Sequence, residues 1–269
     1  MNKIYFCFPG GKHKAVTFSY DDGKLQDRRL TALFNKYGVR GTFNLNSGLW
    51  DRDDKRIKPE EIPELYRGHE VACHTVTHPT IERCPLPEVA EEVLEDRRAL
   101  EKWTGYPVRG LAYPNGSLTD DIVALLPHLG IRYARVVGSS DSFGAPRDAF
   151  RWQATCHHNH RLLENAEAFA ALFKKQYLYL FYVWGHSYEF DDKNNWDMME
   201  EGVKRVAGRE DTWYCTNIEY WDAMDDLKRL RFAADNSFVY NPNAADCYVR
   251  VEDSEEAVRI PGGATVTLK

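Results

Sequence analysis

The sequence lacks the features of a membrane or secreted protein. No apolar run approaches the roughly 18–20 residues that cross a bilayer, and the opening stretch 1–10 has too few apolar residues in a row for a signal peptide. Cysteine is sparse, with six residues and no Cys-x-x-Cys pair. In an unexported chain such cysteines are reduced, mostly buried thiols. We therefore expect a cytoplasmic protein without a membrane partner.

The sequence also lacks a surplus of positive charge. The formal net charge is −6, and the two signs are interspersed without a basic stripe. Nucleic-acid binders need such a stripe, so nucleic acid is not an expected partner. What the chain does have is 269 residues with 43% apolar content, enough for one main domain with a sizeable core. Nothing in the pattern fixes an oligomeric state.

Short apolar segments alternate with amphipathic ones along most of the chain. This order predicts an α/β fold with a parallel sheet, open or closed into a barrel. Strands are expected at 15–20, 41–45, 70–73, 108–112, 132–136, 177–184 and 213–216. Helices are expected at 26–37, 87–103, 119–129, 164–175, 195–206 and 217–230.

The character of the chain changes after Arg231, where turn residues surround short β segments. We predict a barrel domain over 1–231 and a short β appendage over 232–269 that packs on it. Its expected role is to cap the barrel, and a carbohydrate-contacting module is the alternative.

Candidate metal ligands follow two of the expected strands. Asp22 comes directly after the first strand, and the pair His74 and His78 follows the third. One carboxylate and two imidazoles suffice for a catalytic zinc that keeps a position open, and histidines four apart can face one ion on a helical turn or a tight loop. The sequence therefore predicts one divalent metal ion, with zinc first and cobalt, nickel or manganese as chemical alternatives.

Two further residues complete a hydrolytic set. Asp21, beside the ligand Asp22, stays free to accept a proton from water. His186 ends a long apolar strand and could protonate a leaving amine, although a hydrogen-bonded histidine at a strand end is the alternative. All of these residues lie at the C-terminal ends of expected strands, where parallel barrels carry their active sites.

These motifs resemble those of the polysaccharide deacetylases of carbohydrate esterase family 4, which share the chitooligosaccharide deacetylase homology domain. The family motif Thr-Phe-Asp-Asp-Gly reads Ser-Tyr-Asp-Asp-Gly at residues 19–23. The motif His-Ser/Thr-x-x-His is matched in full by 74–78, and an apolar strand ending in histidine by 180–186. The resemblance implies a distorted parallel (β/α) barrel with about seven strands. It covers roughly residues 15–230.

The resemblance also implies a role for each site residue. Asp21 is the implied catalytic base and His186 the implied general acid, with the metal on Asp22, His74 and His78. The backbone of Tyr113, within Ala-Tyr-Pro-Asn-Gly at 112–116, is implied to help hold the oxyanion.

The chain departs from the family pattern in two motifs. Lys24 replaces the proline that follows the first motif, and Ala112 replaces an arginine of the third. Another residue must then orient Asp21, and Arg109 and Arg151 are the candidates.

The expected substrate contacts are Trp152, Trp184 and Pro114. Aromatic rings can stack on sugars, although core packing is their commoner use. The family's Asp-Trp element, which orients the acid histidine, has no clean counterpart, and Arg151-Trp152 lies in about the right interval.

The run 156–160, Cys-His-His-Asn-His, is a rival metal cluster. Adjacent histidines on a strand face opposite ways, so at most two can converge, and we expect this segment at the rim of the groove. Cys73 is a weaker candidate ligand. The charged residues over 88–98 are assigned to a solvated helix face.

Together these features predict a divalent-metal-dependent hydrolase that removes N-linked, or also O-linked, acetyl groups from a carbohydrate. The alternatives are a hydrolase of a small cyclic amide or ureide, and a non-catalytic sugar-binding protein on the same barrel.

Overall fold

The computed structural model describes residues 3–252 and 254–268. Within them, nine strands form one sheet in which all pairs are parallel. The strands are β2 (Lys14–Asp21), β3 (Gly41–Leu45), β4 (Glu70–Cys73), β5 (Gly110–Ala112), β6 (Tyr133–Val136), β7 (Trp152–Gln153), β8 (Cys156–His157), β9 (Tyr179–His186) and β10 (Thr212–Tyr214). Their order is β7-β6-β5-β4-β3-β2-β9-β8, and β10 pairs with the beginning of β2.

The predicted α/β class and the distorted parallel barrel are confirmed. The sheet curls and ends at two edge strands, β7 and β8, which pair only with β6 and β9 among the described residues. These two strands raise the count from the predicted seven to nine. Each has two residues, too few for an alternation of apolar and polar positions to reveal them in the sequence.

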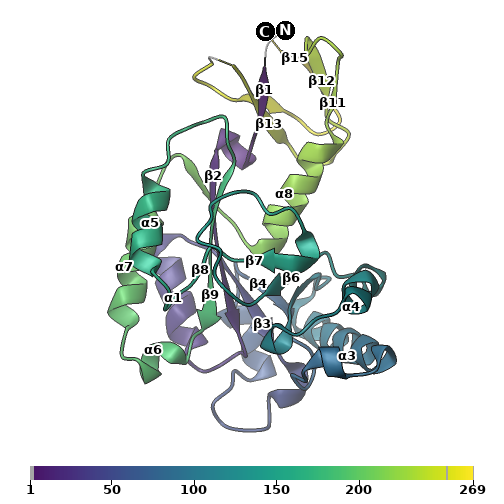
Figure 1. The fold of residues 1–269 in the computed structure, drawn as a ribbon, viewed down its shortest axis with the longest axis vertical. Coiled ribbons are helices and arrows are strands. Elements are labelled where there is room, and N and C mark those ends of the chain that lie inside the picture. The colour runs from purple at the N-terminus through teal and green to yellow at the C-terminus, as the bar shows by residue number, and fades with distance from the viewer. Residues whose placement is uncertain (1–2, 253, 269) are drawn as a thin grey trace.

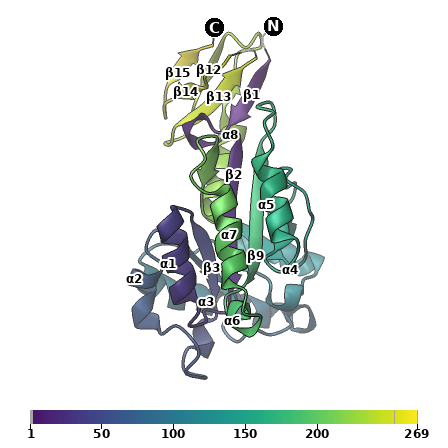
Figure 2. The ribbon, with the colours of Figure 1, turned by 90° about the vertical axis from the view of Figure 1, so that its left-hand side faces the viewer.

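Eight helices of the described chain cover the sheet. They are α1 (Asp27–Tyr37), α2 (Ile62–Leu65), α3 (Leu86–Thr104), α4 (Asp120–Leu125), α5 (Leu162–Ala170), α6 (Glu189–Asp192), α7 (Trp196–Val206) and α8 (Asn217–Arg229). Helix α7 lies between α1 and α5 on one side, and α3 and α4 lie together elsewhere on the barrel (Figures 1 and 2). The amphipathic patterns of the sequence therefore predicted the long helices α1, α3, α5, α7 and α8.

The central strand β2 explains why the site is rigid. All eight of its residues are buried, because β9 pairs along its whole length on one side while β3 and β10 share the other. Its C-terminal end carries Asp21, and the register places that residue beside His186 at the end of β9.

Two small antiparallel sheets lie at one end of the molecule (Figure 1). One contains β1 (Ile4–Cys7), β13 (Cys247–Val251) and β14 (Val258–Ile260), and the other β11 (Arg231–Phe232), β12 (Phe238–Tyr240) and β15 (Thr265–Thr267). Strand β1 was not predicted, and it pairs with β13 across the predicted boundary between 1–231 and 232–269. A division into two units there remains a prediction.

These small sheets lie away from the catalytic end of the barrel. Strand β1 is followed closely by β2, so the small sheets sit where β2 begins, and β2 then runs eight residues away from them. At about 3.3 Å per residue, the end of β2 is roughly 25 Å from its start.

Two composition-based expectations can be compared with the structure. All six cysteines are unpaired, and five of them are buried. Among the residues described, no helix combines the length and apolar character that crossing a bilayer requires.

Candidate metal centre and catalytic site

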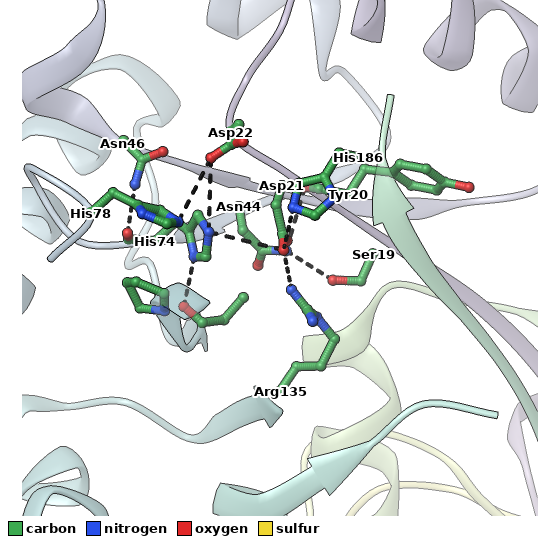
Figure 3. Close-up of polar contacts among 12 residues, drawn as sticks. Ser19, Tyr20, Asp21, Asp22, Asn44, Asn46, His74, His78, Arg135 and His186 are labelled. Atoms are coloured by element: carbon green, nitrogen blue, oxygen red, sulfur yellow. Dashed lines mark hydrogen bonds and ion pairs between the residues drawn. The ribbon is translucent and has the colours of Figure 1, made fainter. Parts of the chain in front are cut away.

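The three predicted metal ligands converge. The Nε2 atoms of His74 and His78 lie 3.9 and 4.0 Å from Oδ1 of Asp22, and one ligand atom from each residue lies within 4.8 Å of the others (Figure 3). His74 Nδ1 donates to the carbonyl oxygen of Ala112 at 2.7 Å. This bond places the hydrogen on Nδ1 and leaves the Nε2 lone pair facing Asp22. Burial lowers the pKa of His74, which also favours the neutral, ligating form. The residues thus fit a divalent cation.

The backbone is strained at two of these ligands. Asp22 has φ 79° and His78 has φ 60°, both in the left-handed region that non-glycine residues rarely adopt. At Asp22 the turn is held by its N–H, which donates to Asn44, and by Arg56, whose Nη1 donates to the Asp22 carbonyl at 2.8 Å. Strain held by surrounding bonds is typical of functional sites.

The loop that carries both histidines is fastened by polar side chains. Asn46 Nδ2 donates to the carbonyl oxygens of His74 and Thr75 at 2.6 and 3.0 Å. Oδ2 of Asp96 accepts from the His74 N–H at 3.0 Å, and Oδ1 accepts from the Ser47 N–H at 2.8 Å. The spacing of the pair therefore reflects a tight loop and not a helix.

Helix α3 contributes more to this loop than was predicted. The charges over 88–98 were assigned to a solvated face, but Asp96 is fully buried and Glu92 accepts from both the N–H and the hydroxyl of Thr77. That expectation was wrong for Asp96, whereas Glu92 stays partly exposed while it binds the loop. Helical spacing alone does not distinguish a carboxylate facing solvent from one facing a loop with unpaired N–H groups.

The predicted base, Asp21, lies beside the metal ligands. It is 2% exposed, and its Oδ2 lies 3.9 Å from His74 Nε2. Arg135 on β6 donates through Nη2 to Oδ2 of Asp21, and Asn44 Nδ2 donates to Oδ1 at 2.8 Å (Figure 3). Burial opposes ionisation, but the charge of Arg135 outweighs it and lowers the pKa of Asp21 to about 2.

The residue that orients Asp21 is therefore Arg135, and neither expected arginine does so. Arg109 forms a bidentate ion pair with Asp222, and Arg151 pairs with Asp120 and Asp148. The sequence held a signal for Arg135, because it is a charged residue inside an apolar strand of a parallel sheet.

His186 faces the same centre. Its Nε2 lies 4.0 Å from Oδ2 of Asp21, and its Nδ1 lies 3.6 Å from Oε1 of Glu189. Burial lowers the pKa of His186, but the nearby carboxylates of Glu189, Asp21 and Asp22 outweigh it, so the pKa is raised. Glu189, and not the Arg151-Trp152 segment, is the carboxylate that faces this histidine.

Tyr113 does not offer the free backbone donor that its implied oxyanion role requires. Its N–H already donates to the carbonyl of Arg135 at 3.0 Å, extending the pairing of β5 with β6. Its hydroxyl donates to the carbonyl of Phe150 at 2.9 Å. The predicted role of this N–H conflicts with the bond that it makes.

All three predicted substrate contacts are buried or nearly so. Trp152 is 1% exposed, packed against Tyr182 and Tyr220, and offers no surface to a substrate. Pro114 is also buried. Trp184 is nearly buried at 8% exposed, and its ring lies against the guanidinium of Arg135. Substrate contact remains a prediction for Trp184, and it conflicts with the burial of Trp152 and Pro114.

A cavity of about 450 Å³ opens beside Asp22. Its lining includes Lys24, Lys55, Tyr188 and Asp192. This volume lies within the 300–1,000 Å³ that small ligands occupy. Lys24, the departure from the first family motif, therefore borders the space next to the metal ligands.

The rival histidine run lies close by, as the groove-rim expectation proposed. His157 and His158 converge on Glu189, with their Nε2 atoms 3.2 and 2.9 Å from its Oε2. His160 turns away and pairs with Asp141. Two of the three histidines converge, within the predicted number, but they are the adjacent pair that strand alternation would place on opposite faces. Strand β8 ends at His157, so the alternation does not reach His158.

Part of the chain is similar in sequence to known proteins. Residues 9–134 match the family model for polysaccharide deacetylase. The chitooligosaccharide deacetylase of Bradyrhizobium sp. (strain ANU 289) is 40% identical over 130 residues, which are 48% of this chain and 52% of that protein. The chitooligosaccharide deacetylase of Sinorhizobium fredii (strain NBRC 101917 / NGR234) is 36% identical over 121 residues, 44% of this chain and 54% of that protein. The chain thus spans about half the length of these curated relatives.

Solved structures share the fold over a longer stretch. A Mycobacterium smegmatis protein, provisionally described as a polysaccharide deacetylase, matches with a TM-score of 0.65 and 16% identity, over 85% of this chain and 96% of that one. The Xyl-CE4 domain of a multidomain xylanase from the Trinervitermes trinervoides hindgut metagenome matches with a TM-score of 0.54 and 16% identity, over 79% and 92%. At such identities these structures establish the fold alone. The similarity to polysaccharide deacetylases thus covers residues 9–134 in the family model and just under half of the chain in the curated relatives.

Proposed function

We propose that the protein is a divalent-metal-dependent hydrolase that removes acetyl groups from a carbohydrate, N-linked groups first and O-linked groups as a second target. The observation that carries this proposal is the ionised Asp21, fixed by Arg135 immediately beside the three-residue cluster Asp22, His74 and His78. The named relatives, which are chitooligosaccharide deacetylases, support the substrate class.

Each residue of the site has a role in this reaction. Asp22, His74 and His78 would hold the cation, with zinc the first choice for this ligand set. When bound, such a cation lowers the pKa of water and polarises the acyl oxygen. Asp21 accepts the proton of the attacking water, because Arg135 and Asn44 hold its carboxylate ionised and correctly oriented.

The leaving group receives its proton from His186. The carboxylates around this histidine favour its charged form, so that it can donate from Nε2 to a departing nitrogen. Base and acid are thus two groups whose environments move their pKa values apart, as acid–base catalysis requires.

The two alternatives make different demands. A small cyclic amide or ureide could use the same base, acid and metal, so only the choice of substrate distinguishes it. A sugar-binding protein whose appendage binds the sugar would place binding at the far end of the barrel from Asp21. Such a sugar-binding protein would not need the hydrogen bonds that hold the carboxylate of Asp21 in place.

Acetate release tests the proposal. Chelated protein is assayed with N-acetylated oligosaccharides and O-acetylated xylan fragments before and after zinc, cobalt or manganese is restored. Metal-dependent release that Asp21→Asn abolishes is the expected result. If no substrate releases acetate while one metal ion is bound per chain, the proposal is overturned. Cyclic amides would then be assayed.

A further inference from the structure

Glu189 is the first residue of α6 and lies three positions after His186. Its Oε2 faces Nε2 of His157 at 3.2 Å and Nε2 of His158 at 2.9 Å. Its Oε1 faces Nδ1 of His186 at 3.6 Å. One partly buried carboxylate therefore stands at the centre of three imidazoles, and only one of these reaches the catalytic centre.

The bonds of Asn159 fix the hydrogen position on His157, while its Nδ2 also lies 3.0 Å from Nε2 of His158. The N–H of Asn159 donates to Nδ1 of His157 at 3.1 Å, so a neutral His157 carries its hydrogen on Nε2 and donates it to Glu189. Asn159 Nδ2 also donates to Oε2 of Glu189 at 3.2 Å. With Oε2 occupied in this way, Oε1 is the oxygen left for His186.

Packing makes the arrangement rigid. His158 is fully buried, and its ring stacks on Tyr20 with an interplanar angle of 8°. A Cβ at Gly185 would lie 2.0 Å from His158 Nδ1, so glycine at this position of β9 lets the ring approach the strand. Ser187, next to His186, donates to the buried Asp27 at 2.5 Å. Both neighbours of His186 in the chain are thus held in place.

His186 itself has an incomplete set of partners. Its Nδ1 is buried and has no hydrogen-bond partner within 3.5 Å among the described residues, and Glu189 is the carboxylate that faces it. A small closure from 3.6 Å gives a charge-assisted bond, as catalytic bonds often tighten when substrate binds. That bond would hold a hydrogen on Nδ1 and direct Nε2 toward Asp21 and the reacting atoms.

Resting on the proposed function, we propose that Glu189, clamped by His157 and His158, is the positioning residue that makes His186 an effective general acid. The same three groups, His157, His158 and Glu189, could alternatively hold a second metal ion. Hydrogen-bond distances and the donation of Asn159 to His157 favour the clamp.

A general acid speeds a reaction only when the leaving group needs a proton. A residue that positions the acid therefore affects such substrates alone, whereas a residue with a purely structural role would affect all substrates. Metal-loaded Glu189→Gln is compared with the parent on an N-acetylated oligosaccharide and on 4-nitrophenyl acetate, whose leaving group departs as the anion. We expect kcat on the amide to fall on the order of 10²-fold with KM unchanged. Turnover of the ester should stay within about twofold, since Asp21 and the metal ligands are intact.

Matched variants complete the test. Asp197→Asn, which removes an exposed carboxylate at the start of α7, should behave as the parent on both substrates. His157→Gln, at a partly exposed position, should give a smaller loss in the same direction and serves if Glu189→Gln does not fold. In a His186→Ala background, Glu189→Gln should cause no further loss on the amide.

Three results would overturn the inference. They are equal losses on amide and ester, an additional loss in the His186→Ala background, or a second metal equivalent in the parent that Glu189→Gln removes. A parent that releases no acetate from any acetylated sugar would instead be a failure of the proposed function. The two failures are therefore distinguishable.

Discussion

Arg135 on β6 binds the carboxylate of Asp21 on β2, although three strands lie between these two strands in the sheet. At about 4.8 Å per strand, a flat sheet would separate them by roughly 19 Å, beyond the reach of any side chain. The contact is possible because the sheet curls and turns its interior side chains toward one another. The curvature of the barrel is therefore what makes a distant arginine available to the predicted base.

Removing Arg135 should damage both stability and catalysis. Arg135→Met leaves Asp21 as a buried charge without its ion-pair partner, and such a change typically costs about 3–5 kcal/mol of unfolding free energy. It should also raise the pKa of Asp21, since the arginine is the main group that lowers it. Urea unfolding and the rate of acetate release measure the two effects.

A second substitution separates these two effects. In Arg135→Met with Asp21→Asn no charged group of the pair remains, so most of the lost stability should return while activity stays absent. A double variant as unstable as Arg135→Met alone would mean that packing of Arg135 against Trp184, and not its charge, holds this part of the barrel.

Neighbouring carboxylates of the site should have separable roles. Asp21→Asn should retain the metal and lose about 10²–10⁴-fold in kcat, the usual contribution of a positioned general base. Asp22→Asn should lose the metal itself, because one of three ligands is weakened. Metal content after dialysis and the rate with excess metal distinguish the two variants. Equal loss of metal from both would show that Asp21 is also a ligand.

The sequence was informative where a short local motif identifies the site residues. Asp22, His74 and His78 were found because their spacing and their places after strands are local features, and the geometry brings them together. Arg135 was missed although its charge inside an apolar strand marked it as unusual, because its partner depends on how strongly the sheet curls. Glu189 was missed for a related reason, since its importance depends on two histidines that converge from another strand.

The same distinction applies to the fold. Long strands and helices were predicted within a few residues, because their apolar periodicity extends over several turns or alternations. The missed strands β1, β7, β8 and β11 have two to four residues each and exist only through their pairing with other strands. Their pairing is a tertiary effect that propensity does not encode.

Asp96 should support metal binding without touching the metal. Asp96→Ala removes the acceptor of the Ser47 N–H and one of the two acceptors of the His74 N–H, which keeps its bond to the carbonyl of Leu45. The lost acceptor of Ser47 should cost about 1–3 kcal/mol. Because the His74 loop is then less fixed, metal affinity should fall by about 10–100-fold. Competition with a chromogenic chelator measures the affinity. The control is Glu95→Ala on the same helix, where an exposed ion pair with Arg98 is lost and affinity should not change.

Glu70 is buried in the barrel and is not one of the proposed site residues. Its ionisation should make the free energy of unfolding depend on pH. Burial raises its pKa to about 7 although Ile218, Thr42 and Tyr133 all donate to it. The unfolded chain ionises this carboxyl from about pH 4.5, whereas the folded chain holds it neutral until about pH 7. Its contribution to stability is therefore fully present below pH 4.5 and is lost as pH rises through 7. The slope within this window reaches about 1.4 kcal/mol per pH unit.

Glu70→Gln tests this dependence because glutamine keeps the shape and the acceptor oxygen but does not titrate. The difference in unfolding free energy between parent and variant should change with pH between about 4.5 and 7, with the parent losing stability relative to the variant as pH rises. Comparing the difference removes the contributions of Asp27 and Asp96, whose pKa values burial also raises to about 7 and which titrate in both proteins. Urea unfolding at half-unit pH steps provides the measurement. Parallel curves across the window would mean that the ionised carboxylate, satisfied by its three donors, is the folded form already at low pH.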